Sequence, residues 1–221
     1  MLKDILSDAL EEHDFRLESE TEFSKYYILQ EESAIRFAII YELYDVVSAE
    51  ELNTLVTKNS PSSFLENPAY KKNSDLICIL KIEHLASFKS IEDEIFAIEE
   101  DPYQYKKYVL YYIDAEEAII KDINFNDLKK VISDKHQFTQ YKIDPLQPSM
   151  YSLAARIFIK LPFLELPHNN DKLIPLKHQA QEAVSENELS SLYEKIQKSQ
   201  TMEYDEDKLI EELINNEMEN I

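Results

Sequence analysis

The sequence predicts an α+β protein, in which a small mixed or antiparallel sheet is flanked by helices and followed by a helical C-terminal extension. Three observations support this fold class. Two β-rich runs, 22–30 and 34–43, are joined by a short polar segment. A dense apolar run at 76–82 has the length of a strand. Apolar residues at helical spacing occur before, between and after these runs.

The N-terminal part is expected to form a helix and a β-hairpin. Apolar residues from Leu2 to Leu10 recur at the spacing of one helix face, and this helix should end near His13. The runs 22–30 and 34–43 then supply the two strands of the hairpin. Alternating apolar residues along the second run should bury one face of the sheet.

The next segment predicts a helix, a long loop and a central strand. Ser48 is followed three residues later by Glu51, a capping-box pattern that indicates a helix start. Residues 58–74 are rich in Ser, Asn and Pro and are interpreted as a long loop. The apolar run 76–82 fits a central strand that is covered on both faces.

Helices dominate the expected structure beyond this strand, with one ambiguous segment. Ser90 and Asp93 form a second capping-box pattern ahead of an apolar helix face. Residues 105–113 fit either a helical stripe or a strand, and their Tyr, Val and Ile content favours a strand. Residues 115–135 suggest one or two helical pieces, interrupted near Asn124.

The chain is expected to divide into a body at 1–166, an irregular linker at 167–181 and an acidic helical extension at 182–221. Residues 151–159 suit a buried helix at the end of the body, and the chain from 162 to 175 looks irregular. The extension contains twelve acidic residues and three lysines, a net charge of −9. Its helices should fold by docking on the body or on a partner.

The apolar stripes of the extension are the first candidates for partner binding. They lie on two expected helices, the first of which begins with a capping box at Ser185. The stripe residues proposed to contact a partner are Leu189, Leu192, Tyr193, Ile196, Ile210, Leu213 and Ile214.

The composition excludes several classes of catalytic and nucleotide-binding protein. The 221 residues contain no glycine, whereas P-loops, Rossmann fingerprints, kinase loops and nucleophile elbows require it. Asn and Asp must therefore serve the left-handed turns. The 44 acidic and 23 basic residues give a net charge of −21, which would repel a phosphate backbone, so direct nucleic-acid binding is not expected. Strong acidity instead favours basic protein partners or mimicry of a polyanion.

The cysteine content and the N-terminus indicate a cytoplasmic protein. Cys78 is the only cysteine, which excludes an intrachain disulfide and a cysteine-based zinc cluster and agrees with a reducing compartment. The N-terminus lacks a basic segment followed by a long apolar stretch, and no apolar window approaches the length of a membrane span. We therefore expect neither secretion nor a membrane partner.

No sequence motif identifies a catalytic residue, a cofactor or a metal. The five histidines are scattered and lack the spacing of a zinc-binding helix. The acidic triplet 99–101 could hold a divalent ion, but its side chains point in different directions on a helix, which favours a solvent-exposed helix end. Asp75 precedes a strand, as in carboxylate-and-lysine nucleases, but the Glu-x-Lys pair of those enzymes is missing. Cys78 is interpreted as a core residue.

Tyrosine is abundant, and five of the fourteen tyrosines crowd between residues 103 and 112. Tyrosine supplies a large contact area with a polar tip, and such clusters are enriched at protein interfaces. An interface and a packing layer of the core fit the cluster equally well. The candidates for partner contact in the cluster are Tyr103, Tyr105 and Tyr108.

Two stretches of the chain resemble a bacterial family. They are EIFAIEEDPYQYKKYVLYY at 94–112 and RIFIKLPFLEL at 156–166. Both are similar to the small middle component of ABC-three-component systems, the group that includes Lamassu-type anti-phage and anti-plasmid defence. The similar region covers roughly residues 76–166.

The resemblance implies an accessory subunit, and neither stretch supplies a catalytic residue. Such a subunit would contact an SMC- or Rad50-like ATPase near its head or proximal coiled coil. It would help to hold or release an effector, which is often a nuclease. Nucleotide and DNA would be handled by these partners.

Two other functions stay open. An acidic inhibitor or DNA mimic would occupy a nucleic-acid-binding partner, and its binding would weaken as the salt concentration rises. A hydrolase built from dispersed carboxylates would require a deep pocket with perturbed acids, which a sequence does not reveal.

Overall fold

The computed structural model describes most of the N-terminal three quarters of the chain and a few positions beyond it. The described residues are 1–30, 34–167, 183–185, 189–190 and 193. The chain divides into two compact units, Met1–Pro167 and His168–Ile221. In the second unit, residues 183–185, 190 and 193 have helical conformation.

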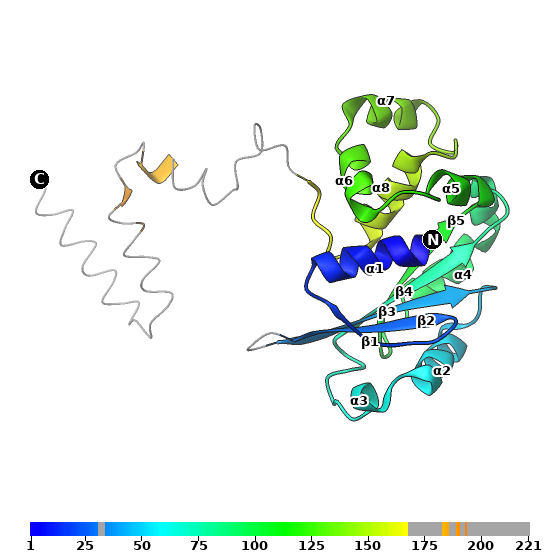
Figure 1. Ribbon diagram of the computed structural model, residues 1–221, viewed down its shortest axis with the longest axis vertical. Helices are drawn as coiled ribbons and strands as arrows, with labels where there is room; N and C mark the ends of the chain where they lie inside the picture. The colour runs from blue at the N-terminus through cyan, green and yellow to red at the C-terminus, as the bar shows by residue number, and fades with distance from the viewer. Residues whose placement is uncertain (31–33, 168–182, 186–188, 191–192, 194–221) are drawn as a thin grey trace, which may run out of the picture. The chain divides into compact units, whose positions relative to one another are not determined.

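The first unit is built on a five-stranded mixed sheet with the order β1-β2-β3-β4-β5 (Figure 1). The strands β1 (Arg16–Glu20), β2 (Ser24–Gln30) and β3 (Ile35–Leu43) are antiparallel. The strands β4 (Ser74–Lys81) and β5 (Lys106–Tyr112) continue the sheet in parallel to β3. The predicted fold class, α+β with a small mixed sheet flanked by helices, is confirmed.

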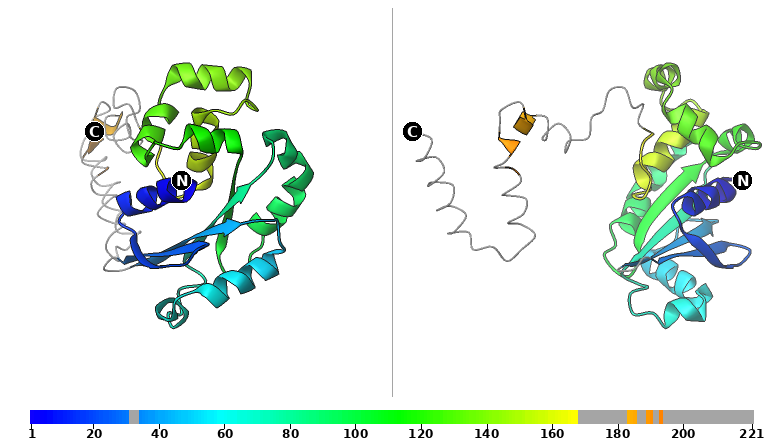
Figure 2. Two further views of the ribbon diagram at one scale, coloured as in Figure 1. Left: turned by 45° about the vertical axis from the view of Figure 1, so that its right-hand side comes forward. Right: turned by 60° about the vertical axis from the view of Figure 1, so that its left-hand side comes forward.

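Helices cover both faces of this sheet, so that the sheet forms the middle layer (Figure 2). One face packs against α2, α3 and α4, and the opposite face packs against α1, α6 and α8. The helices of the first unit are α1 (Leu2–Glu12), α2 (Ala49–Asn59), α3 (Ser62–Leu65), the short 3-10 helix η1 (Leu85–Ser87), α4 (Phe88–Glu99), α5 (Asp114–Ile119), α6 (Phe125–Ile132), α7 (Lys135–Ile143) and α8 (Met150–Lys160).

The central strand β4 shows how the sheet divides the core. Leu76, Cys78 and Leu80 face α2, α3 and α4, whereas Ile77 and Ile79 face α1, α6 and α8. Because successive side chains of a strand point to opposite faces, an unbroken apolar run requires cover on both faces. Each of these five side chains is at most 4% exposed, which confirms the predicted central strand.

Most predicted elements are confirmed. The hairpin is formed by β2 and β3, although both faces of β3 are covered rather than one. The segment 105–113 is a strand, and 115–135 contains two helices, α5 and α6. Ser48 caps α2, since its Oγ accepts a hydrogen bond from the Glu51 amide at 3.2 Å.

Two local predictions are wrong. The capping box at Ser90 does not form, because η1 runs directly into α4, which already begins at Phe88. Ser90 Oγ instead donates to the Ser87 carbonyl at 2.7 Å. The predicted loop at 58–74 contains the short helix α3, which carries the buried Phe64 into the core.

The connection from α4 to β5 is held by a buried lysine. The side chain of Lys107 is 0% exposed and donates to Asp101 Oδ2 at 2.7 Å. It also donates to the carbonyls of Tyr103 at 2.7 Å and Tyr105 at 3.1 Å. The same carboxylate accepts from Asn53 Nδ2 on α2 at 3.2 Å. These bonds use all three donors of the ammonium group and tie the loop to β5 and to α2.

This loop also contains an unusual backbone conformation. Among the described residues, Asp14 and Gln104 have left-handed backbone, with φ of 64° and 63°. Aspartate tolerates this conformation, as expected for a chain without glycine. Glutamine has no such preference, so the conformation of Gln104 depends on the bonds that Lys107 makes to the carbonyls of the residues on either side.

Replacing Lys107 by methionine should lower the free energy of unfolding by about 3 kcal/mol, because Asp101 loses its cation and two carbonyls lose their donor. The matched control is Lys106→Met. Lys106 is exposed and should change stability by less than about 0.5 kcal/mol. Urea denaturation monitored by circular dichroism measures both. Equal midpoints for the two variants would contradict the role given to Lys107.

Candidate functional site

Two carboxylates of the acidic triplet considered for metal binding have structural roles. Glu99 Oε1 accepts from the Val109 amide at 2.7 Å and pairs with Lys160 of α8. Asp101 pairs with the buried Lys107, and these bonds outweigh its partial desolvation, so that the pKa of the carboxyl is lowered. The expectation of a solvent-exposed helix end is therefore wrong for these two residues, because the end of α4 packs against β5.

The other groups considered for chemistry also have structural partners or surroundings. The buried carboxylate of Asp75 accepts from Arg36 Nη2 at 2.8 Å. His13 packs against Phe125 and Phe163, with ring centroids at 6.4 and 5.6 Å. In the part of the chain that the structure describes, no three His, Cys, Asp or Glu side chains are placed to hold a metal ion.

Cys78 lies on β4 and is fully buried, and this burial raises the pKa of its thiol to about 12. The thiolate is the reactive form of cysteine, so its population is very small near neutral pH. The core position predicted for Cys78 is confirmed.

Alkylation of Cys78 with iodoacetamide at pH 8 should proceed at least about a hundredfold more slowly in the folded protein than in the same chain unfolded in urea. The cause is the combination of a low thiolate population and a closed core. Mass spectrometry of timed samples gives both rates, and similar rates in the two states would show that the thiol is accessible and reactive.

The two stretches that resemble the ABC-three-component family contact each other. Glu99 in the first stretch pairs with Lys160 in the second. The guanidinium of Arg156 in the second stretch lies 4.8 Å from the centre of the Tyr111 ring in the first. Arg156 also pairs with Glu116, which is 0% exposed and accepts from Ser152 Oγ at 2.9 Å. Both stretches therefore help to fix α8 against β5.

The structure separates the three tyrosines proposed to contact a partner. Tyr103 is 72% exposed on the loop before β5. Tyr105 is 2% exposed in the core and its hydroxyl lies 2.9 Å from Thr57 Oγ1. Tyr108 is half-buried against the α1, α6 and α8 layer. Tyr105 thus takes the core role of the two alternatives, and Tyr103 presents its side chain to solvent.

The candidates in the C-terminal extension are described only in part. Leu189 is 48% exposed, and its carbonyl accepts from the Tyr193 amide at 2.9 Å, as in a helix. The candidates that lie outside the described residues are Leu192, Ile196, Ile210, Leu213 and Ile214.

A cleft of about 510 Å³ lies at the carboxyl ends of the parallel strands β3, β4 and β5. We call it the carboxyl-edge cleft. Sheets with parallel strands commonly bind ligands at this end, because the connecting loops leave a crevice there. The residues that line it are Glu42, Leu43, Tyr44, Ile79, Lys81, Ile82, Glu83, Tyr112 and Asp114.

Carboxylates dominate the carboxyl-edge cleft. Lys81 Nζ contacts Asp114 at 2.5 Å and Glu117 at 2.8 Å, and these hydrogen bonds raise the pKa of the lysine. Glu83 and Asp114 are 85% and 87% exposed. The three carboxylates that line the cleft therefore exceed its single lysine, which favours a cationic ligand.

An exposed aromatic side chain borders the same cleft. Tyr44 is 75% exposed and its ring packs edge-on against Phe23, with centroids 5.6 Å apart. Tyrosine is enriched in the core of protein-binding surfaces, and polar residues surround that core as a rim. Sequence reasoning missed Tyr44, although an aromatic residue directly after a predicted buried strand is the signal that marks it.

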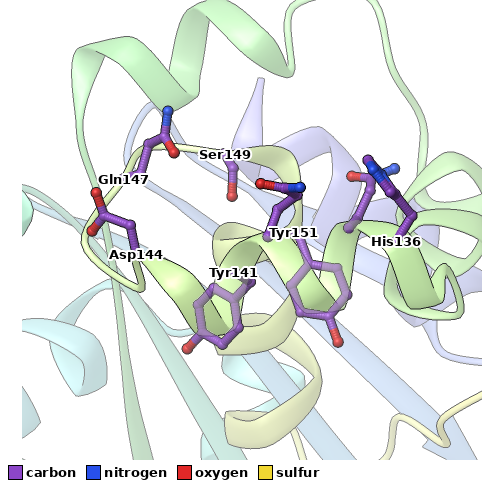
Figure 3. Close-up of a pocket in the computed structure, with 8 residues that line it drawn as sticks. His136, Tyr141, Asp144, Gln147, Ser149 and Tyr151 are labelled. Atoms are coloured by element: carbon purple, nitrogen blue, oxygen red, sulfur yellow. The ribbon is translucent and has the colours of Figure 1, made fainter.

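A smaller groove lies between α7 and the start of α8 (Figure 3). The rings of Tyr141 and Tyr151 lie side by side there, with centroids 5.3 Å apart. The groove holds about 170 Å³, below the usual range for small-molecule sites. It is lined by His136, Gln137, Gln140, Tyr141, Asp144, Gln147, Ser149 and Tyr151. We interpret this groove as a gap between packed helices.

Comparison with known proteins supports the family resemblance. Residues 36–136 match the family model of the ABC-three component (ABC-3C) system Middle Component 1. No curated protein and no solved structure matches the chain. Within the described residues, no helix is both long and apolar enough to cross a membrane.

The matched region differs from the region expected from the sequence. It begins in β3 and ends in α7, so it includes the first resembling stretch and the parallel part of the sheet. The second stretch at 156–166 and the C-terminal extension lie outside the match. The expected limits of 76–166 are therefore wrong at both ends, while the family to which the match points is the expected one.

Proposed function

We propose that this chain is a non-catalytic accessory subunit of a bacterial ABC-three-component defence system of the Lamassu type. The observation that carries the proposal is the match of residues 36–136 to a middle component of such systems. A middle component works together with other subunits. In agreement with a binding role, the carboxylates considered for chemistry, Glu99 and Asp101, are engaged by Lys160 and Lys107.

The proposed partners are an SMC- or Rad50-like ATPase and an effector, often a nuclease, in the bacterial cytoplasm. The carboxyl-edge cleft is suited to a basic segment of a partner, because carboxylates surround it and Tyr44 offers an exposed ring. The exposed Tyr103 is a second contact candidate within the matched region. In this function the subunit holds its partners together, and nucleotide hydrolysis and DNA binding are carried out by those partners.

The C-terminal extension would supply the apolar part of the interface with the ATPase. We propose a body at 1–166, a linker at 167–181 and an extension at 182–221 that carries the stripe with Leu189 and Tyr193. The exposure of Leu189 supports this assignment. Association through apolar burial resists salt, whereas an acidic DNA mimic would dissociate as salt screens its charges.

Charge substitutions in the stripe should disrupt the complex. A variant with the three substitutions Leu189→Asp, Leu192→Asp and Leu213→Asp should co-purify with the ATPase subunit of the same system at least about tenfold less. The reason is that carboxylates replace apolar side chains that the complex would bury. The measurement is affinity purification of the 221-residue chain at about 150 and about 500 mM salt. Electrostatic association weakens at the higher concentration because salt screens charges, whereas apolar association persists.

The control replaces Ser185, Ser190 and Ser199 by aspartate, which adds the same charge to the same segment. This variant should retain the ATPase as the unsubstituted chain does. Circular dichroism of both variants checks that the body stays folded. Unchanged co-purification of the leucine variant would show that the extension is not part of the interface. Dissociation of the unsubstituted complex at high salt would favour the DNA-mimic alternative.

A further inference from the structure

A second large cleft lies at the opposite end of the parallel strands. It holds about 440 Å³ and is lined by Ala34, Ile35, Arg36, Lys72, Asn73, Asp75 and Lys106. We call it the amino-edge cleft, because β3, β4 and β5 begin there. Its volume falls in the usual range of small-molecule sites.

The strand register brings the charged side chains of this cleft together. Asp75 on β4 pairs with Ala38 on β3 and with Lys106 on β5. Arg36 lies two residues before Ala38, so it shares the same face of the sheet. Lys72 and Asn73 precede β4 and complete the lining. Side chains from three strands and one loop thus converge on one space.

The amino-edge cleft is positively charged in a strongly acidic chain. Three cations line it against the single carboxylate of Asp75, although the chain carries a net charge of −21. Arg36 neutralises Asp75 through a hydrogen bond of 2.8 Å, and its side chain remains 43% exposed. Because that bond uses one of five guanidinium donors, Arg36 is held in place with donors left for a ligand.

The two lysines of the cleft lack carboxylate partners. Neither Lys72 nor Lys106 forms an ion pair with any residue that the structure describes. Elsewhere in the body, Lys81, Lys107 and Lys129 each contact a carboxylate. Gathering unpaired cations costs electrostatic free energy, and an anion placed between them recovers it.

We propose that the amino-edge cleft binds a compact anion with two or more phosphate groups, supplied as inorganic polyphosphate or as the phosphate chain of a nucleotide. Lysine ammonium groups and an arginine fixed by a carboxylate are the groups that proteins use to hold phosphates. The Asn73 side chain, which donates to the Ile35 carbonyl at 3.2 Å, helps to fix the rim of the cleft.

The charges around the cleft favour a small anion over a polymer. Duplex DNA would extend beyond the cleft onto a surface whose net negative charge repels it. A long acidic peptide would meet the same repulsion. A compact polyphosphate fits within the cleft and contacts Arg36, Lys72 and Lys106 together.

The test is isothermal titration calorimetry of the full-length chain with pyrophosphate, tripolyphosphate, AMP and ATP. Saturable binding of pyrophosphate or tripolyphosphate at one site per chain is the expected result. Equal affinities for tripolyphosphate and ATP would show that the protein recognises the phosphate groups alone. A higher affinity for ATP than for tripolyphosphate would show that it recognises a nucleotide. Both results support the proposal.

Charge variants locate the binding. Lys72→Glu with Lys106→Glu should weaken binding at least about tenfold, because two attractive contacts become repulsive. Lys121→Glu with Lys135→Glu makes the same change in net charge at exposed lysines outside the cleft and should leave the affinity within about threefold. Thermal unfolding of both variants checks that the fold is kept.

Three results would overturn the proposal. In the first, pyrophosphate, tripolyphosphate and ATP all fail to bind saturably to the unsubstituted chain, or AMP, with its single phosphate, binds as tightly as they do. In the second, the Lys72 and Lys106 variant binds as tightly as the control. In the third, duplex DNA or a polyglutamate peptide binds through these lysines while pyrophosphate and tripolyphosphate do not.

Discussion

The parallel register of β3, β4 and β5 is the constraint on which both clefts depend. It aligns Ala38, Asp75 and Lys106 at the amino ends of the strands and places Lys81 beside Tyr112 at the carboxyl ends. Because parallel strands begin at one end of the sheet and finish at the opposite end, the same hydrogen bonds define two separate clefts. One edge gathers cations and the other gathers carboxylates and aromatic rings.

Buried and half-buried charge pairs hold this part of the sheet in place. Lys107 fixes the approach to β5, and the pair between Lys160 and Glu99 links α8 to the end of α4 on the other face of the sheet. Arg156 adds a contact with the ring of Tyr111. Removing one member of a buried pair leaves an uncompensated charge, so these residues are strongly constrained. Some of the many acidic residues therefore stabilise the fold through ion pairs. Partner binding, the proposed function, requires no catalytic carboxylate.

The sequence predicted those elements whose apolar pattern is strong. The run along β4 indicated a central strand because both faces are apolar, whereas β1 went unnoticed because its residues are almost all exposed and pair with β2 through the backbone. The helix α7 buries none of its residues, so it lacks an apolar stripe. The burial of Tyr105 depends on contacts with Thr57 and Tyr70, which are distant in sequence. The clefts require the parallel crossovers, which no local pattern specifies.

We propose that the molecule acts by being bound between larger subunits. Hydrogen–deuterium exchange of the chain alone and within its purified complex measures which segments that binding protects. Exchange should be slower in the complex at 42–44, 81–83 and 112–114, which border the carboxyl-edge cleft, and across 183–193. Unchanged exchange in all four segments would show that the partners do not hold the chain through these surfaces.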